Sequence, residues 1–572
     1  MDRLKQLSLL LIILINSTLL YAQKSNTSTI EKNIKISTSE TIYVHSNNDA
    51  FVTGETLYYQ LYCLNSENFK PSEISKIAHI KLLTSDDKVV AEQKMALKNG
   101  TGYGDIFIPS SLNSGNYKLI GYTNWTLNKR KDKYFTKNIT IVNPFQEESK
   151  NIISKPLETT TTIVNQSKNN KTTTSTIITS KKNYSQRELV SYKLNSLSQI
   201  TDGNYSVSVN KIDAFTTQKQ DNSITFSNLN TNSEIIYTSF LPEFRGEIIS
   251  GTVTTKNNQN TVNEISVGLS IPGEDFLFKI VKTNSLGKFF FTIDKEYTNP
   301  NFTIQVINPN RKEYEISINT NKNIEINSAT TTSLSLDKSM IQSIKERAIA
   351  TQIENAYFNN KKDSIVKISN SKLFYNPIEK DYILDDYNRF PTFKETITEV
   401  LKEVYYTENE NQYKIGVRDF DKKTEIEAPT LLLIDGLLIQ DANELIDLKM
   451  DSIYKISTIK GGYYYGPNIY NGMVSIISKN HDYDSKLSGS FIVKSNQILT
   501  NSKKEYYSPD YSKQSNTRIP DYRHQLLWLP EYDINKTISF YTSDVKGTFE
   551  IIIEGFTKDG EPVSISDTFE VN

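Results

Sequence analysis

Few side chains in this 572-residue sequence have the types and spacing that catalysis or metal binding requires. The only cysteine is Cys63, and the four histidines are His45, His79, His481 and His524. None of these histidines lies at metal-ligand spacing from another histidine or from the cysteine, so the pattern predicts no zinc site. Cys63 falls inside a predicted strand and is expected to be a small buried apolar residue.

Asp435 and Glu444 are the carboxylates considered as a catalytic pair. Asp435 precedes Gly436, and aspartate is favoured in an Asp-Gly turn because its side chain hydrogen-bonds to the local backbone. No local signature of a Ser-His-Asp set occurs in the sequence. We therefore expect a protein that is not an enzyme, and a hydrolase without a recognisable motif is the least favoured alternative.

The run Gly461–Gly466 consists of glycines and tyrosines (GGYYYG). It lacks the G-x-x-x-x-G-K-[ST] pattern of a phosphate-binding loop, and bulky tyrosines occupy it. Two interpretations are open. The run is a loop between strands with glycines at positive φ, or it is a contact surface, because exposed tyrosines give interface energy at low entropy cost. The second interpretation names Tyr463, Tyr464, Tyr465 and Tyr470 as candidate partner contacts.

The elements that must position these residues are mainly strands. The chain is rich in Tyr, Phe, Thr, Ile and Val and contains 34 tyrosines, a bias that favours sheets over helices. Its length predicts roughly four domains, which can build hydrophobic cores without disulfides. The formal net charge is -1, and without a basic excess neither nucleic acid nor a membrane surface is an expected partner.

The N-terminus has the three parts of a secretory signal peptide. Arg3 and Lys5 are positive, the run LSLLLIILINSTLL is apolar, and Ala22 is the small residue at the exit. This order predicts a signal peptide over residues 1–22, with an uncleaved anchor as the alternative. No other stretch approaches the roughly 20 apolar residues of a spanning helix, so no further transmembrane segment is expected. The sequence thus predicts an exported protein, periplasmic or associated with the outer membrane, and leaves exposure at the cell surface open.

Short strands separated by turn signals fill residues 24–145 and predict an antiparallel sandwich. The stretches with a family resemblance are 51–55 (FVTGE), 114–119 (SGNYKL) and 121–125 (GYTNW). They resemble the macroglobulin-type β-sandwich of large secreted bacterial proteins. Residues 181–240 resemble a second copy, and residues 146–180, rich in Ser, Thr, Asn and Lys, predict a linker between the two.

A different module follows over residues 241–325. It begins with FRGEIISGTV at 244–253 and contains the hairpin sequence NSLGKFFF at 284–291. This order resembles the small seven-stranded carboxypeptidase-regulatory-like domain, which implies a spacer rather than a catalyst. Residues 326–380 predict a helical connector, because 337–354 places Ala, Ile and charged residues at helical spacing.

Residues 381–480 alternate helices and strands. An amphipathic helix is predicted over 393–404, and strands are predicted over 431–434, 453–459 and 472–478. The motifs that carry a resemblance are LIDG at 433–436, NEL at 443–445, YYG at 464–466 and NGMVSIIS at 471–478. In order and spacing they resemble the plug domain of TonB-dependent outer-membrane receptors.

The residues after the plug-like segment differ from those of a TonB-dependent receptor. Only about 90 residues follow the plug-like segment, too few for a transmembrane barrel. Residues 481–572 resemble a closing macroglobulin-type sandwich. As a whole the chain resembles a group of secreted proteins, typical of the Bacteroidetes, that join macroglobulin-like domains to a plug-like domain.

This resemblance implies a mainly β fold of tandem macroglobulin- or immunoglobulin-like sandwiches with one carboxypeptidase-regulatory-like domain and one α+β plug-like domain. It implies a scaffold or accessory subunit, without cofactor, that binds an outer-membrane β-barrel protein or complex through the plug-like domain. An independent binder of proteases or peptides is the alternative. Protease-trapping macroglobulins carry a thioester formed from Cys and Gln in a Gly-Cys-Gly-Glu-Gln run, which is missing around Cys63, so no covalent trapping is expected.

Overall fold

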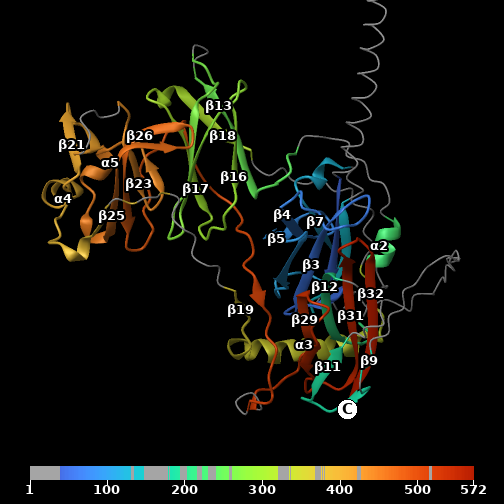
Figure 1. The fold of residues 1–572 in the computed structure, drawn as a ribbon. Helices are drawn as coiled ribbons and strands as arrows, with labels where there is room; N and C mark the ends of the chain where they lie inside the picture. Colours follow the sequence, from blue (N-terminus) through green and yellow to red (C-terminus); the bar gives the residue numbers. More distant parts are fainter. Residues whose placement is uncertain are drawn as a thin grey trace, which may run out of the picture. The chain divides into compact units, whose positions relative to one another are not determined.

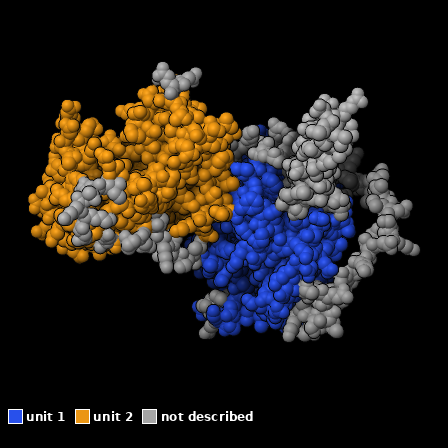
Figure 2. All heavy atoms as spheres, turned by 45° about the horizontal axis from the view of Figure 1, so that its top comes forward, with its two compact units in different colours: residues 1–244, 324–366, 501–572 blue, residues 245–323, 367–500 orange. Residues whose placement is uncertain are grey.

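The structure, a computed structural model, separates into two compact units (Figure 2). Unit 1 comprises residues 1–244, 324–366 and 501–572, and unit 2 comprises residues 245–323 and 367–500. The described residues are 39–129, 134–146, 178–179, 181–193, 202–215, 222–229, 240–256, 260–319, 334, 336–366, 375, 378, 380–420, 427–513 and 518–572. The predicted signal peptide and most of the predicted linker lie outside them. Among the described helices, none has the length and apolar character needed to cross a membrane.

Unit 1 begins with a two-sheet sandwich (Figure 1). One sheet has the order β1-β3-β6 and the other the order β2-β8-β7-β4-β5. The strands are β1 (Glu40–Ser46), β2 (Ala50–Val52), β3 (Thr56–Asn65), β4 (Ile77–Leu83), β5 (Val89–Ala96), β6 (Thr101–Phe107), β7 (Gly115–Tyr122) and β8 (Phe135–Val142). Every residue of β1 and β4 is buried, because both strands are covered on each face, and the core between the sheets includes Cys63.

The second sandwich of unit 1 combines two distant parts of the chain. Its sheets have the orders β10-β32-β31-β12-β29 and β30-β11-β9. The strands are β9 (Ile178–Thr179), β10 (Asn183–Tyr184), β11 (Leu189–Lys193), β12 (Gly203–Lys211), β29 (Gln525–Tyr532), β30 (Ile538–Tyr541), β31 (Gly547–Thr557) and β32 (Pro562–Val571). The sequence predicted separate sandwiches over 181–240 and 481–572, and the sheet order corrects this. Neither part has enough strands to cover a core, so β12 inserts between β29 and β31.

A long helix, α3 (Met340–Ala356), lies in the predicted connector and packs on unit 1. Ile344 and Ala348 join a buried cluster with Ala50, Val52 and Val142 of the first sandwich. The short elements of this unit are η1 (Thr126–Asn128), α2 (Ser223–Leu229), η5 (Phe358–Asn360), β19 (Ser364–Ile365) and β28 (Lys504–Glu505). The pairing of β19 with β28 brings the two connecting segments of unit 1 together.

Unit 2 contains a seven-stranded sandwich, with sheets β16-β13-β18 and β15-β14-β17-β27. Its elements are β13 (Glu247–Thr255), β14 (Ser266–Ile271), β15 (Leu277–Lys282), β16 (Lys288–Ile293), β17 (Asn301–Ile307), η4 (Arg311–Glu313), β18 (Tyr314–Ile318) and β27 (Ile492–Asn496). Alternation along β16 buries Phe289 and Phe291 and exposes Phe290. Because β27 pairs with β17, it belongs to this sandwich and not to the closing sandwich predicted from residue 481.

The rest of unit 2 is an α+β domain around the sheet β20-β25-β26-β23-β24. Its elements are β20 (Lys380–Ile383), η6 (Leu384–Asp386), α4 (Phe393–Glu399), β21 (Val404–Asn409), β22 (Gln412–Val417), β23 (Leu431–Ile434), β24 (Leu437–Ile439), α5 (Asn443–Ile446), η7 (Met450–Ser452), β25 (Ile453–Tyr465) and β26 (Asn468–Ser478). The mainly β fold class predicted from the sequence is thus confirmed, with one α+β domain among the sandwiches.

Two elements of this domain differ from the sequence prediction. The helix predicted to reach Val404 ends at Glu399, and Val404 begins the hairpin β21–β22. Glu410 and Asn411 both adopt positive φ in the hairpin turn, as a tight two-residue turn requires. The glycine-tyrosine run is not a loop either, because β25 continues to Tyr465 past a register shift between Ile459 and Gly462.

Candidate binding site

The four candidate tyrosines do not form one exposed cluster. Tyr464 is 73% exposed and Tyr470 is 4% exposed, while Tyr463 and Tyr465 are half-buried. Alternation along β25 explains the difference, because successive side chains of a strand point to opposite faces. The expectation of a single exposed tyrosine surface is therefore wrong, and only Tyr464 has the exposure that it requires.

The other three tyrosines pack inside unit 2. The ring of Tyr465 stacks on Phe278 of β15 with centroids 5.4 Å apart, and its hydroxyl donates to the Phe278 carbonyl oxygen. Tyr463 stacks on Tyr465, and Tyr470 belongs to the same apolar cluster with Phe276. These rings join the sandwich of unit 2 to its α+β sheet, so their first role is in the core.

On the opposite face, Tyr464 pairs with Ile469 across the β25–β26 hairpin. Ile469 is 44% exposed. The hairpin tip therefore presents a small apolar surface of two cross-strand neighbours. Of the contact surface that the sequence suggested, only this part is exposed.

The residues considered for chemistry have structural surroundings. Asp435 is fully buried, and its carboxylate accepts hydrogen bonds from the backbone N–H and hydroxyl of Ser478 at 2.7 and 2.6 Å. Glu444 accepts from the hydroxyl of Tyr483 at 2.9 Å. Burial raises the pKa of the Cys63 thiol well above its usual range. In the described ranges, no group of three His, Cys, Asp or Glu side chains could hold a metal ion.

A second candidate site is an open cavity of about 640 Å³ in unit 1. Its walls come from both sandwiches, from α3, and from the segments beside β19 and β28. Ligand pockets in proteins commonly have volumes of roughly 300–1,000 Å³. This cavity is therefore large enough for a small molecule or for several residues of a peptide.

Aromatic side chains form one wall of the cavity. The ring of Tyr58 lies 4.9 Å from that of Tyr506, edge to face, and 6.2 Å from that of Trp528, stacked. Three further aromatic side chains of the lining are exposed large hydrophobic residues: Phe107 at 53%, Phe358 at 59% and Tyr522 at 41%. The cavity thus combines an aromatic wall with an aromatic rim that nothing within the described chain covers.

The lining also contains two carboxylates without a basic partner of their own. Each of its five basic side chains lies within 3.7 Å of a carboxylate; the pairs are Lys211–Glu346, Arg347–Glu55, Lys361–Glu354, Lys504–Asp105 and Arg523–Asp521. Two lining carboxylates remain, Asp213 and Asp363. Asp213 is 4.0 Å from Arg347, which Glu55 already pairs. Asp363 has no ion pair among the described residues and accepts one hydrogen bond, from the Tyr507 backbone N–H at 2.8 Å.

Burial makes the two remaining carboxylates easier to protonate. It raises the pKa of Asp213 and of Asp363, and the nearby Asp105 raises the pKa of Asp363 further. Desolvation disfavours the charged form of an acid that lacks a counter-ion. His524 has the opposite shift, because burial and the cations Arg347 and Lys211 lower its pKa to about 3.

Helix α3 holds the walls together. Arg347, 5% exposed, donates two hydrogen bonds to the Glu55 carboxylate at 2.8 and 2.7 Å. Glu354 accepts from the Tyr522 backbone N–H at 2.6 Å, so the helix touches both sandwiches. The helix approaches the turn at Gly54 so closely that a Cβ there would lie 2.6 Å from the Thr351 methyl group. Only glycine fits this turn, whose φ is +96°.

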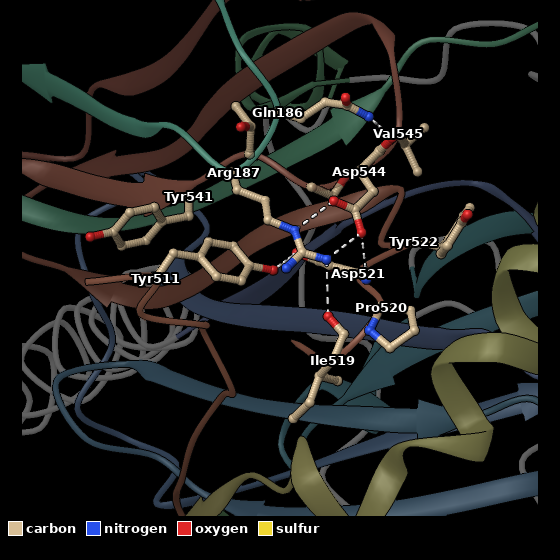
Figure 3. Close-up of polar contacts among 12 residues, drawn as sticks. Gln186, Arg187, Tyr511, Ile519, Pro520, Asp521, Tyr522, Tyr541, Asp544 and Val545 are labelled. Atoms are coloured by element: carbon tan, nitrogen blue, oxygen red, sulfur yellow. Dashed lines mark hydrogen bonds and ion pairs between the residues drawn. The ribbon is translucent and has the colours of Figure 1, made fainter. Parts of the chain in front are cut away.

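The wall that contains Arg523 has its own polar support, drawn in Figure 3. Arg187 donates to both oxygens of Asp544 at 2.6 Å and to the Ile519 carbonyl oxygen at 3.0 Å. Tyr511 donates to Asp521, which in turn pairs with Arg523. Charge-assisted, bidentate pairs of this kind fix orientation. They tie the chain before β29 to the turn before β11.

The sequence interpretation did not find this cavity. Residues 51–55 and the range 481–572 were assigned to two sandwiches, and residues from both contribute to the lining. The walls come from segments near 50, 105, 210, 350, 505 and 525, and no periodicity or motif relates positions so far apart. The only local feature of the sequence that could have indicated the cavity is the close spacing of aromatic and charged residues at 504–507 and 522–528.

Comparisons with known proteins give no family assignment. No protein-family model and no curated protein matches the chain. Among solved structures, a mutant Salmonella alpha-2-macroglobulin matches at 8% identity with a TM-score of 0.23, covering 94% of this chain and 40% of its own. An Escherichia coli alpha-2-macroglobulin activated by porcine elastase matches at 7% identity with a TM-score of 0.23, covering 93% and 44%. Dimeric latent PorU from Porphyromonas gingivalis matches at 8% identity with a TM-score of 0.17, covering 50% and 33%.

The chain spans about two fifths of the length of the two alpha-2-macroglobulins. The plug-like resemblance of residues 381–480 stays a prediction. Any functional conclusion rests on the geometry of the two candidate surfaces.

Proposed function

We propose that this protein is a non-enzymatic scaffold that binds another protein, and that the cavity of unit 1 receives a segment of that partner. The observation that carries the proposal is the uncovered aromatic rim formed by Phe107, Phe358 and Tyr522 around the cavity. Clustered exposed aromatic side chains are typical of interaction sites, and aromatic anchors supply most of the energy in many interfaces.

The charges of the cavity support binding rather than catalysis. All five basic side chains are engaged by carboxylates. His524, with its pKa near 3, stays neutral at physiological pH, whereas a general base works best with a pKa near the operating pH. A wall built from engaged ion pairs suits the recognition of a partner more than proton transfer.

An exported protein of the outer membrane is the proposed partner. The predicted signal peptide over 1–22 and the plug-like resemblance of 381–480 support this location. The hairpin pair Tyr464 and Ile469 is the proposed second contact, because both side chains are exposed on the face of β25 and β26 that does not pack on β15.

Capture from detergent-solubilised outer membranes tests the function. The full-length chain serves as bait beside a variant with Phe107→Ser and Phe358→Ser. Phe145→Ser is the matched control, since Phe145 is 57% exposed in unit 1 and does not line the cavity. We expect the wild type and the control to retain one outer-membrane protein that the double variant loses. Equal capture by all three would contradict the proposal, and recovery of a protease instead would favour the alternative function.

A further inference from the structure

The charged side chains of the cavity indicate the charge of its occupant, in addition to the apolar character that the aromatic rim suggests. The lining contains five acids and five basic side chains. Two of these cations, Lys211 and Arg523, pair with carboxylates outside the lining, those of Glu346 and Asp521. Asp213 and Asp363 are therefore left over, because every lining cation already has another carboxylate within 3.7 Å.

Asp363 is placed to receive a cation. Its Oδ1 accepts the Tyr507 backbone N–H, and no bond to its Oδ2 is found within the described chain. The charges of Asp363 and Asp105 both act on the hydroxyl of Tyr58, so the two carboxylates and the aromatic wall surround one region of the cavity. Asp363 is half-buried, and burial raises the pKa of its carboxyl although the nearby Lys504 opposes this shift. A bound cation would relieve the cost of this burial.

The rings beside Asp363 suit a cation as well. Tyr58 and Tyr506 lie edge to face at 4.9 Å, and Tyr58 stacks on Trp528. An ammonium or guanidinium group is attracted to the face of an aromatic ring, and more strongly where water is excluded. A carboxylate next to aromatic faces therefore favours a long basic side chain, whose apolar stem can lie along the rings.

Resting on the proposed function, we propose that the partner segment places a Lys or Arg side chain in the cavity, against the Asp363 carboxylate and the Tyr58–Tyr506 wall. The cavity volume of about 640 Å³ exceeds what one side chain fills. Neighbouring apolar residues of the segment contact Phe107, Phe358 and Tyr522 at the rim. The occupant is thus a basic segment of a protein, and not a free small cation.

Intrinsic fluorescence can report this occupant. The chain has two tryptophans, Trp125 and Trp528, and only Trp528 lines the cavity. In a full-length Trp125→Phe background, Trp528 is the sole tryptophan emitter. The probes are acetyl-Ala-Leu-Arg-Leu-Ala-amide, the same peptide with citrulline in place of arginine, and arginine amide alone. Citrulline keeps the shape of arginine and removes its charge.

We expect the arginine peptide to change the Trp528 emission in a saturable manner and to bind at least tenfold tighter than the citrulline peptide. Asp363→Asn should reduce this ratio to threefold or less, and Asp363→Glu should retain it. Asp559→Asn, at an exposed surface pair with Lys70, is the control and should leave the ratio unchanged. Arginine amide alone should bind far more weakly than the peptide.

Three outcomes with the peptides would overturn the inference: no saturable change with the arginine peptide, equal binding of both peptides, or a ratio unaffected by Asp363→Asn. Arginine amide binding as tightly as the peptide would also overturn it, by assigning the cavity to small cations. These failures are distinct from failure of the proposed function. The outer-membrane capture depends on the rim phenylalanines and would survive a cavity that prefers an uncharged segment.

Discussion

Two groups of aromatic side chains, one in each unit, have opposite roles. In unit 2, Tyr465 and Tyr470 lie between the sandwich and the α+β sheet, in one cluster with Phe278. In unit 1, Phe107 and Phe358 stay exposed at the edge of a cavity. A tyrosine-rich run in the sequence is therefore no guide to an exposed surface. Strand alternation and the neighbouring domain decide whether a ring belongs to a core or to a binding site.

The largest effect is expected where unit 1 joins its two chain segments. Phe569 is 1% exposed and contacts the rings of Tyr184, Tyr192, Phe540 and Phe549. Phe569→Ala should reduce the free energy of unfolding of unit 1 by about 3–5 kcal/mol, as for other buried aromatic residues. Urea unfolding followed by hydrogen exchange in each unit measures the change.

The matched substitution for this test is Phe393→Ala, at a fully buried residue of unit 2. It should lower the protection of unit 2 and leave that of unit 1 unchanged. If Phe569→Ala and Phe393→Ala both weaken the two units equally, the units do not have separate cores and the comparison fails.

A smaller effect should separate the tyrosines of unit 2. Tyr470→Ala removes a ring that is 4% exposed and should cost about 3 kcal/mol of the stability of this unit. Tyr464→Ala removes a ring that is 73% exposed and should change stability by no more than about 0.5 kcal/mol. Thermal or urea unfolding of the two full-length variants measures the difference. Similar destabilisation by both would place Tyr464 in the core too.

The units should also differ in acid sensitivity. Unit 1 has three histidines whose pKa burial lowers to about 3: His45, His79 and His524. Such a histidine stays neutral in the folded chain and takes up a proton on unfolding below its unfolded pKa near 6.5. The stability it contributes is complete above pH 6.5 and is lost as the pH falls from there toward 3.

His79→Phe isolates one of these contributions. His79 stacks on Tyr122 with centroids 4.9 Å apart, and phenylalanine can keep this contact. Between pH 6 and 4 the stability of the variant should fall less steeply than that of the wild type, by up to about 1.4 kcal/mol per pH unit. Glu554, whose pKa burial raises, acts in the opposite direction but equally in both proteins. Identical slopes would show that His79 does not resist protonation.

The smallest effect concerns the cysteine. Cys63 is buried in the first sandwich. No Gly-Cys-Gly-Glu-Gln run surrounds it in the sequence, so it lacks the glutamine that a thioester requires. Incubation of the native protein with methylamine should leave its mass unchanged. A covalent mass increase would reveal a thioester and restore the protease-trapping alternative.

The sequence predicted local elements better than their association. Strands such as Leu431–Ile434 and Gly547–Thr557 contain apolar, β-branched runs that mark them at close range. The union of β12 with β29 and β31 could not be predicted, because pairing between distant strands leaves no periodicity in either segment. A local pattern suggested two sandwiches where long-range pairing makes one.

The candidate site shows the same limit. Tyr464 was found because four tyrosines lie close together in the sequence. The run could not show that Tyr463 and Tyr465 point to the opposite face, where Tyr465 stacks on Phe278 and Tyr463 stacks on Tyr465. The cavity was missed because Tyr58, Asp363 and Trp528 meet only in three dimensions. Burial and ion pairing, which single out Asp363, are properties of the fold and not of the neighbouring sequence.

The central claim is that the cavity of unit 1 is where a partner protein binds. Its most direct test is a photo-crosslinking amino acid placed at Phe358 in the full-length chain, in cells that produce the protein. The account predicts a light-dependent adduct with one outer-membrane protein, and no such adduct when the crosslinker replaces Phe145, an exposed position outside the cavity. Adducts of equal yield at both positions, or none at Phe358, would contradict it.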